Sequence, residues 1–147
     1  MTDLHRIKNF RPVNEHFFTS GQPNEEQLAS LQNSGVQVVI NLGLHDDPSY
    51  SLTDEAGTVQ ALGMEYIHIP VDFNNPTQQN LTDFITWMKI HENKHTLVHC
   101  AANYRVSAFL GLYLHKEKGW LVEDAFAQLY SLWTPNAVWE KFVKENI

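Results

Sequence analysis

The chain has 147 residues, of which 43% are apolar and 18% charged, as in an ordinary globular domain. Its formal net charge of −7 gives no overall attraction to nucleic acid or to anionic membranes, and no basic cluster supplies a local one. No apolar run is long enough to span a bilayer, and residues 1–13 lack the apolar stretch of a secretory signal. One cysteine excludes an internal disulfide and fits a reducing compartment. We therefore expect a cytoplasmic protein, unless a signal peptide has been removed.

Apolar periodicity divides the chain into alternating strands and helices. Strands are expected at residues 17–20, 36–42, 64–69 and 96–99. Helices are expected at residues 25–34, from 51 or 53 to about 62, around 81–88, from 106 to before 119, at 122–133 and at 136–146. Asn24 and Gln27 resemble a capping box at the start of the first helix, and Ser51 or Thr53 can cap the second.

Strands that alternate with helices favour a largely parallel sheet with helices on both faces. We therefore expect an α/β fold with a mainly parallel central sheet of four to five strands flanked by helices. No internal repeat, low-complexity stretch or linker interrupts the chain, so residues 1–147 are expected to form a single domain. The sequence gives no indication of the oligomeric state.

The strongest functional pattern lies between the last predicted strand and the helix that follows it. The lone cysteine, Cys100, ends the apolar run, and Arg105 comes five residues later. Backbone amides and the dipole at a helix N-terminus attract anions and favour the thiolate form of a cysteine. The Arg105 guanidinium adds paired donors that match a phosphate. A simpler reading makes Cys100 a small buried hydrophobe and Arg105 a solvated helix residue.

The run from His99 to Arg105 resembles the His-Cys-x5-Arg signature loop of the cysteine-dependent protein phosphatases. The order of elements resembles the dual-specificity branch of the tyrosine phosphatase fold. Together with the turn at 20–23 and the strand at 39–42, the loop resembles a bacterial phosphatase-like family that is also found fused to a metallo-β-lactamase-type hydrolase. This resemblance covers roughly residues 10–133. It implies an enzyme that hydrolyses phosphate monoesters, of a phosphoprotein or a small metabolite, through a phosphocysteine on Cys100 and without a cofactor.

The resemblance also implies roles for the residues around Cys100. His99 would orient the loop, and Asp72, on the polar loop after the third predicted strand, would protonate the leaving oxygen. Phosphate oxygens would bind Arg105 and the backbone amides of the loop, which belong to Ala101, Ala102, Asn103, Tyr104 and Arg105. Asn103 stands where such phosphatases commonly have glycine, so we expect a left-handed backbone there.

One position departs from the family pattern. Related phosphatases usually have Ser or Thr directly after the arginine, where the hydroxyl stabilises the departing thiolate. This chain has Val106 there, and Ser107 follows one position later on a different face of the predicted helix. If the Ser107 hydroxyl does not reach Cys100, breakdown of the phosphocysteine is expected to be slow.

Other functions stay open on the sequence alone. A phosphate-binding pseudophosphatase fits Val106 and Asn103, and a rhodanese-like sulfurtransferase also uses a loop cysteine ahead of a helix. Ala101 and Ala102 add no lysine to the loop, which disfavours highly charged polyphosphates as substrates. His91, His95 and His99 are spaced by four, but a predicted helix end separates them, so no metal site is expected.

Overall fold

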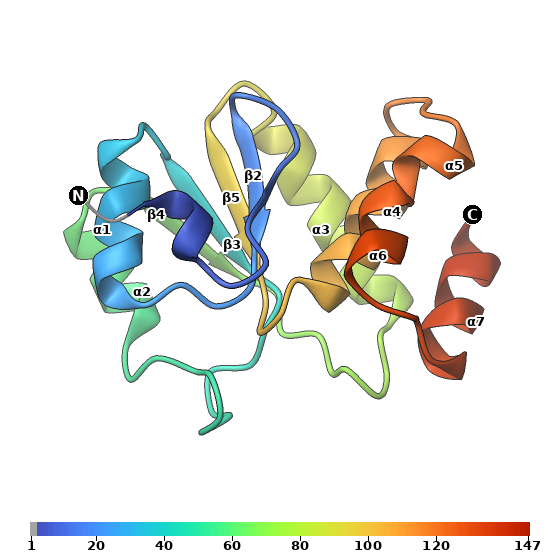
Figure 1. Ribbon diagram of the computed structural model, residues 1–147, viewed down its shortest axis with the longest axis horizontal. Coiled ribbons are helices and arrows are strands. Elements are labelled where there is room, and N and C mark those ends of the chain that lie inside the picture. Colours follow the sequence, from blue (N-terminus) through green and yellow to red (C-terminus); the bar gives the residue numbers. More distant parts are fainter. Residues whose placement is uncertain (1–2) are drawn as a thin grey trace.

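Figure 1 shows the computed structural model, which describes residues 3–147, as a central sheet with helices on both faces. Runs rich in β-branched and aromatic residues form most of its strands. The strands are β1 (Arg11–Pro12), β2 (Phe17–Ser20), β3 (Val38–Asn41), β4 (Glu65–His68) and β5 (Thr96–His99). Their order across the sheet is β1-β2-β5-β3-β4, with β1 antiparallel to β2 and the other neighbours parallel. The expected fold class is therefore confirmed.

The helices form two groups on either side of the sheet. The first group comprises η1 (Leu4–Arg6), α1 (Glu25–Asn33) and α2 (Glu55–Ala61). The second comprises α3 (Gln78–Ile90), α4 (Tyr104–Lys116), α5 (Val122–Ala125), α6 (Ala127–Leu132) and α7 (Ala137–Asn146). Figure 1 shows the first group on the left of the sheet and the second on the right.

Alternate side chains of the central strands feed the two cores that these helices cover. Ile40 and Val98 pack with residues of α3, α4 and α7, whereas Val39 and Leu97 pack with residues of α1 and α2. Because both faces are buried, these strands read as continuous apolar runs rather than as alternating ones.

The first helix starts as the sequence predicts. The Asn24 side chain accepts from the Gln27 amide at 2.8 Å, and the Gln27 side chain accepts from the Asn24 amide at 2.9 Å, so the capping box is complete. The predicted cap of the second helix is wrong, because Asp54 caps α2 by accepting from the Gly57 amide at 3.0 Å. The Ser51 hydroxyl instead donates to the Leu44 carbonyl at 2.6 Å and closes the preceding loop.

The helix predicted over residues 122–133 is divided in two by Phe126. Its ψ of 9° leaves the helical range, so α5 ends before it and α6 begins after it. The Phe126 ring fills the space above Gly111 of α4, where a Cβ atom would collide with it. Packing of one aromatic ring therefore outweighs the local helical preference. The short elements η1 and β1 were also not expected.

The parallel strands bring their carboxyl ends together at one edge of the sheet, the lower edge in Figure 1. Three loops leave from this edge: residues 42–54 after β3, residues 69–77 after β4 and residues 100–103 after β5. In α/β folds this edge is the usual place for a ligand site. Within residues 3–147, none of the helices combines the length and apolar character that a membrane crossing requires.

Candidate active site

The loop after β5 carries Cys100 into the start of α4. Cys100 is almost fully buried, and α4 begins at Tyr104, two residues earlier than predicted. The first backbone hydrogen bond at this end of α4 runs from the Ser107 amide to the Asn103 carbonyl at 3.0 Å. The amides ahead of Ser107 therefore have no partner within the helix and can bind an anion.

Asn103 gives the loop its turn. It has a φ of 68°, so it takes the left-handed conformation that the sequence predicts. Its side-chain amide donates to the Asn9 carbonyl at 2.9 Å and to the Thr19 hydroxyl at 3.1 Å. The Gln128 amide donates to Asn103 Oδ1 at 3.3 Å. Asn103 therefore both permits the turn and ties it to β2 and α6, which a glycine could not do.

The N-terminal segment also holds the loop. The Asn9 side chain donates to the Ala102 carbonyl at 2.9 Å, and the Gln22 amide donates to the Ala101 carbonyl at 3.0 Å. Gly21 lies where the N-terminal segment packs against the Cys100 loop, since a Cβ atom there would come within 2.6 Å of the Ala101 carbonyl oxygen. Any side chain at position 21 would displace the loop.

Arg105 is buried, with only 5% of its surface exposed, and two contacts hold its guanidinium. Nη1 donates to the Val71 carbonyl at 2.8 Å, and Nη2 lies 3.5 Å from the Tyr50 hydroxyl. The rings of Tyr50 and Phe73 lie 5.7 Å and 5.8 Å from the guanidinium carbon, within cation–π range. Nε is buried and has no hydrogen-bond partner within residues 3–147. A buried charged donor of this kind calls for an acceptor that residues 3–147 do not supply.

His99 is held by a buried carboxylate. Its Nε2 atom lies 2.6 Å from Glu55 Oε2, and its Nδ1 atom lies 3.1 Å from the Cys100 carbonyl. Both ring nitrogens thus face acceptors. Burial raises the pKa of Glu55, but the charge and hydrogen bond of His99 and a hydrogen bond from Gln22 outweigh it and lower that pKa. An ionised Glu55 therefore fixes the imidazole, and the imidazole fixes the backbone at Cys100.

A pocket of 480 Å³ lies away from the Cys100 loop, at the opposite edge of the sheet, beside Phe17 and Thr96 at the starts of β2 and β5. It contains no residue of the Cys100 loop. The reactive side chains and the unpartnered Arg105 donor lie at the carboxyl edge, so we assign the site to that edge. Among residues 3–147, no three His, Cys, Asp or Glu side chains converge as a metal-binding group.

Comparison with known proteins identifies the family of this chain. A family model described as a DSP-PTPase phosphatase fused to NAD+ kinase matches residues 4–132. The chain belongs to this phosphatase family. It is therefore a member of the cysteine-based dual-specificity and tyrosine phosphatase superfamily, as the signature loop predicts. No curated protein sequence matches the chain significantly.

Solved phosphatase structures have the same fold. A proposed phosphatase from Shewanella putrefaciens is 33% identical, with a TM-score of 0.85 over 97% of this chain and 93% of the other. TpbA from P. aeruginosa, solved with phosphotyrosine, is 17% identical, with a TM-score of 0.68 over 88% and 75% of the two chains. The core catalytic domain of the PP-IP phosphatase SIW14 from S. cerevisiae, solved with citrate, is 18% identical, with a TM-score of 0.77 over 96% and 86%.

The loop after β4 carries Asp72, the general acid that the family resemblance implies, and contacts Arg105 through its backbone. Asp72 follows Val71, whose carbonyl accepts from the guanidinium, and the Phe73 carbonyl accepts from Trp139 Nε1 at 2.8 Å. The Asp72 side chain itself is exposed and accepts from the Asn74 amide at 2.8 Å. The loop is thus anchored on both sides of Asp72, while its carboxylate forms a turn.

Asp47, on the loop after β3, is a weaker candidate for the acid. Hydrogen bonds from the Ser49 hydroxyl and amide, with a smaller effect from the Arg105 charge, lower the pKa of its exposed carboxyl. A general acid needs the opposite shift, toward the protonated form. Asp47 is therefore a poor candidate, and Asp72 stays the candidate acid that the family resemblance implies.

Ser107 does not act on Cys100 in this structure. Its hydroxyl donates to the Tyr104 carbonyl at 2.6 Å and accepts from Trp133 Nε1 at 3.0 Å. The Trp133 ring stacks on Tyr104 with centroids 4.7 Å apart. Val106 is buried in the same apolar cluster as Cys100. The position that normally offers a hydroxyl to the nucleophile is therefore apolar here.

Three residues of the site had no signal in the sequence. Glu55 reads as an ordinary first-turn acid of a helix, Tyr50 as a loop residue, and Asn9 as part of a polar N-terminus. Their roles depend on contacts across 44, 55 and 93 positions of the chain, respectively. Only the assembled sheet edge brings them to the loop.

Proposed function

We propose that this phosphatase hydrolyses phosphate monoesters through a covalent intermediate on Cys100. The buried Nε of Arg105, which has no partner in the described chain, carries the proposal. Arg105 and the amides at the start of α4 offer donors to the phosphate oxygens around Cys100. No cofactor is required for this chemistry, because the thiolate, the cradle and the acid are all side chains or amides of the chain.

The reaction has two displacements at phosphorus. In the first, the Cys100 thiolate forms a bond to phosphorus while the ester P–O bond breaks, and Asp72 gives its proton to the leaving alkoxide. In the second, water attacks the phosphocysteine and loses a proton to Asp72. Phosphate leaves, and the thiolate is restored. Arg105 binds the equatorial oxygens in both steps.

The substrate class is a phosphorylated protein or a small phosphate ester. The lack of lysine at Ala101 and Ala102 argues against polyphosphates, and the net charge of −7 argues against nucleic acid and membranes as partners. A catalytic thiolate is best preserved in a reducing compartment, so we propose that the enzyme acts in the cytoplasm.

A second candidate function is a phosphate-binding protein with weak turnover. Val106 is buried and apolar, and the Ser107 hydroxyl is engaged by Tyr104 and Trp133. Neither residue assists departure of the Cys100 thiolate. Such a protein would form the phosphocysteine and release it slowly.

Turnover of para-nitrophenyl phosphate by the wild type, Cys100→Ser and Arg105→Lys tests the proposal. We expect no turnover by Cys100→Ser, because a serine hydroxyl is a far poorer nucleophile at neutral pH, while phosphate-like anions still bind. Arg105→Lys keeps the charge but loses the paired donors, so kcat/KM falls by more than about tenfold. Wild-type rates in either variant contradict the mechanism.

A further inference from the structure

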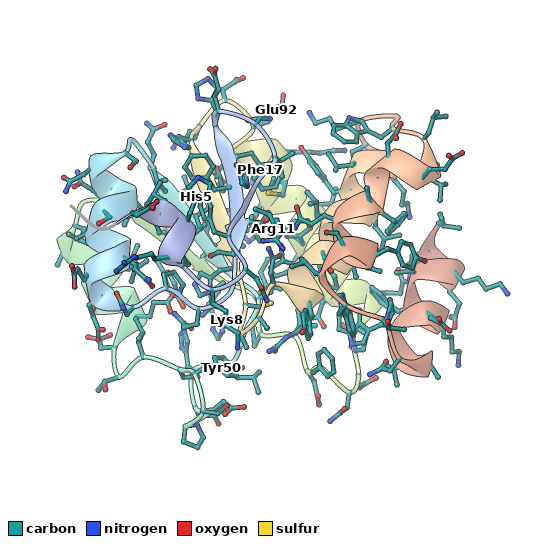
Figure 2. All side chains as sticks on the ribbon, viewed as in Figure 1. His5, Lys8, Arg11, Phe17, Tyr50 and Glu92 are labelled. Carbon is teal, nitrogen blue, oxygen red and sulfur yellow. The ribbon has the colours of Figure 1, made fainter. Side chains whose placement is uncertain are left out.

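A pocket of 250 Å³ opens beside the Cys100 loop, between the N-terminal segment and the loop after β3. Its wall includes Lys8, Gln22, Ser49, Tyr50 and Ala101. Figure 2 shows Lys8 and Tyr50 at the lower part of the molecule, below β2 and β5. Ala101 belongs to the phosphate cradle and Tyr50 contacts Arg105, so the pocket adjoins the site where the ester bond would be cleaved.

The backbone of Lys8 is fixed relative to the cradle. Its carbonyl accepts from the Gly21 amide at 2.7 Å, and the side chain of the next residue, Asn9, donates to the Ala102 carbonyl at 2.9 Å. The Asn103 side-chain amide donates a hydrogen bond to the Asn9 carbonyl at 2.9 Å. These bonds make the start of the pocket wall and the cradle one unit, so Lys8 is positioned rather than carried on a loose terminus.

The Lys8 ammonium group is exposed and has no acidic partner within residues 3–147. Among residues 3–147, four other lysines pair with glutamates, Lys89 with Glu117, Lys94 with Glu65, Lys118 with Glu92 and Lys141 with Glu145, whereas Lys116 and Lys144 are unpaired like Lys8 but do not line this pocket. Lys8 therefore adds an available positive charge to the wall of a pocket next to the phosphate site.

Gln22 gives the same wall a buried acceptor without a partner. Its Nε2 atom donates to the Pro23 carbonyl at 2.9 Å and to Glu55 Oε1 at 2.6 Å, whereas its Oε1 atom has no hydrogen-bond partner within residues 3–147. A flipped amide would place oxygen against two acceptors, so this orientation is fixed. The wall thus combines one cation and the Tyr50 ring with a Gln22 side chain that Pro23 and Glu55 hold in place.

We propose that this pocket holds the alcohol part of the substrate, and that Lys8 pairs with an anionic group on it. The substrate is then a small phosphate monoester that carries one further negative charge, such as a carboxylate. The volume is below the roughly 300–1,000 Å³ of common ligand sites, which favours a small molecule over a peptide. One lysine fits one added charge. This inference rests on the proposed function, since it takes the cradle as the phosphate site.

Binding of unreactive phosphonates tests the inference without turnover. The ligands are para-carboxybenzylphosphonate and its neutral match, para-carbamoylbenzylphosphonate, titrated by calorimetry into the wild type, Lys8→Gln and Lys116→Gln. We expect the wild type to bind the carboxylate about two- to fivefold more tightly than the amide, as for an exposed ion pair, and salt to reduce this ratio. Lys8→Gln removes the preference. Lys116→Gln removes an equal charge from the exposed end of α4, and we expect this control to keep the preference for the carboxylate.

Three results overturn the inference: no charge preference in the wild type, the same preference in Lys8→Gln, or no binding of either phosphonate. Tighter binding of a neutral phosphonate analogue of a phosphotyrosine peptide overturns the assignment to a small acid. Turnover of para-nitrophenyl phosphate is measured separately on the same samples. If the enzyme turns over para-nitrophenyl phosphate but shows no Lys8-dependent preference, the proposed function stands and this inference fails. If the preference is present but there is no turnover, the proposed catalytic function fails and the assignment of the pocket stands.

Discussion

The carboxylate of Glu55, the first residue of α2, lies 2.6 Å from the imidazole of His99, the last residue of β5, and both side chains are buried. The imidazole in turn contacts the Cys100 carbonyl at 3.1 Å. A helix on one face of the sheet is thereby linked to the nucleophile loop at its edge. The pair gives the loop an anchor that depends on the ionisation of Glu55.

This link predicts that the pair's stabilising effect is lost in acid. The pKa of Glu55 is lowered from its ordinary value of 4.5, so the unfolded chain binds the proton more readily than the folded one. The stabilisation by Glu55 is complete above pH 4.5, and it is lost as the pH falls through the lower pKa that Glu55 has in the folded state. At pH 7 we expect Glu55→Gln to lower the free energy of unfolding by about 1.5–3 kcal/mol.

Urea unfolding of the wild type and Glu55→Gln over a series of pH values measures this effect. The difference in the free energy of unfolding between the wild type and Glu55→Gln should become smaller below pH 4.5. A gap that stays constant down to acid unfolding would show that the charge of Glu55 does not stabilise the fold.

Asn103 and Asn9 are the two non-glycine residues with positive φ within residues 3–147, and the former donates to the carbonyl of the latter. We expect Asn103→Ala to destabilise the fold by about 1–3 kcal/mol, through backbone strain and lost hydrogen bonds. Asn103→Gly keeps the backbone and loses only the hydrogen bonds, so it should cost less. Denaturant unfolding ranks the two variants. Equal losses would mean that the left-handed turn adds no strain.

Much of this fold and site follows from local sequence patterns. Apolar runs located the four long strands, and the spacing from Cys100 to Arg105 located the loop, because both signals lie in adjacent residues. Phe126 escaped prediction because its position is decided by Gly111 on another helix. Glu55 and Tyr50 escaped because their partners, His99 and Arg105, are distant in sequence. Long-range packing, rather than any weak local signal, sets these features.

Asp72→Asn tests the general acid. We expect kcat to fall by about 100-fold or more for phenyl or alkyl phosphates, whose leaving oxygen needs a proton. The loss should be much smaller for para-nitrophenyl phosphate, whose leaving group departs unprotonated. Steady-state kinetics with a series of leaving groups measures the difference, and Asp46→Asn on the loop after β3 is the matched control. Equal losses for every leaving group would make Asp72 a structural loop residue.

Val106→Ser tests why the second step would be slow. A hydroxyl at this position can stabilise the departing thiolate, so we expect a smaller burst and a faster steady rate in pre-steady-state kinetics. Ser107→Ala should leave the rate of phosphocysteine breakdown unchanged, because that hydroxyl is bound to Tyr104 and Trp133. A burst that responds to Ser107→Ala and not to Val106→Ser would reverse these roles.

The phosphocysteine itself gives the most direct test of the central claim. Wild-type enzyme is mixed with a phenyl phosphate ester, quenched in acid within the first turnover, digested and examined by mass spectrometry. The account predicts a phosphoryl group on the peptide that contains Cys100, more of it in the wild type than in Val106→Ser, and none in Cys100→Ser. Turnover without a phosphoryl group on Cys100, or turnover that survives Cys100→Ser, would contradict the covalent mechanism.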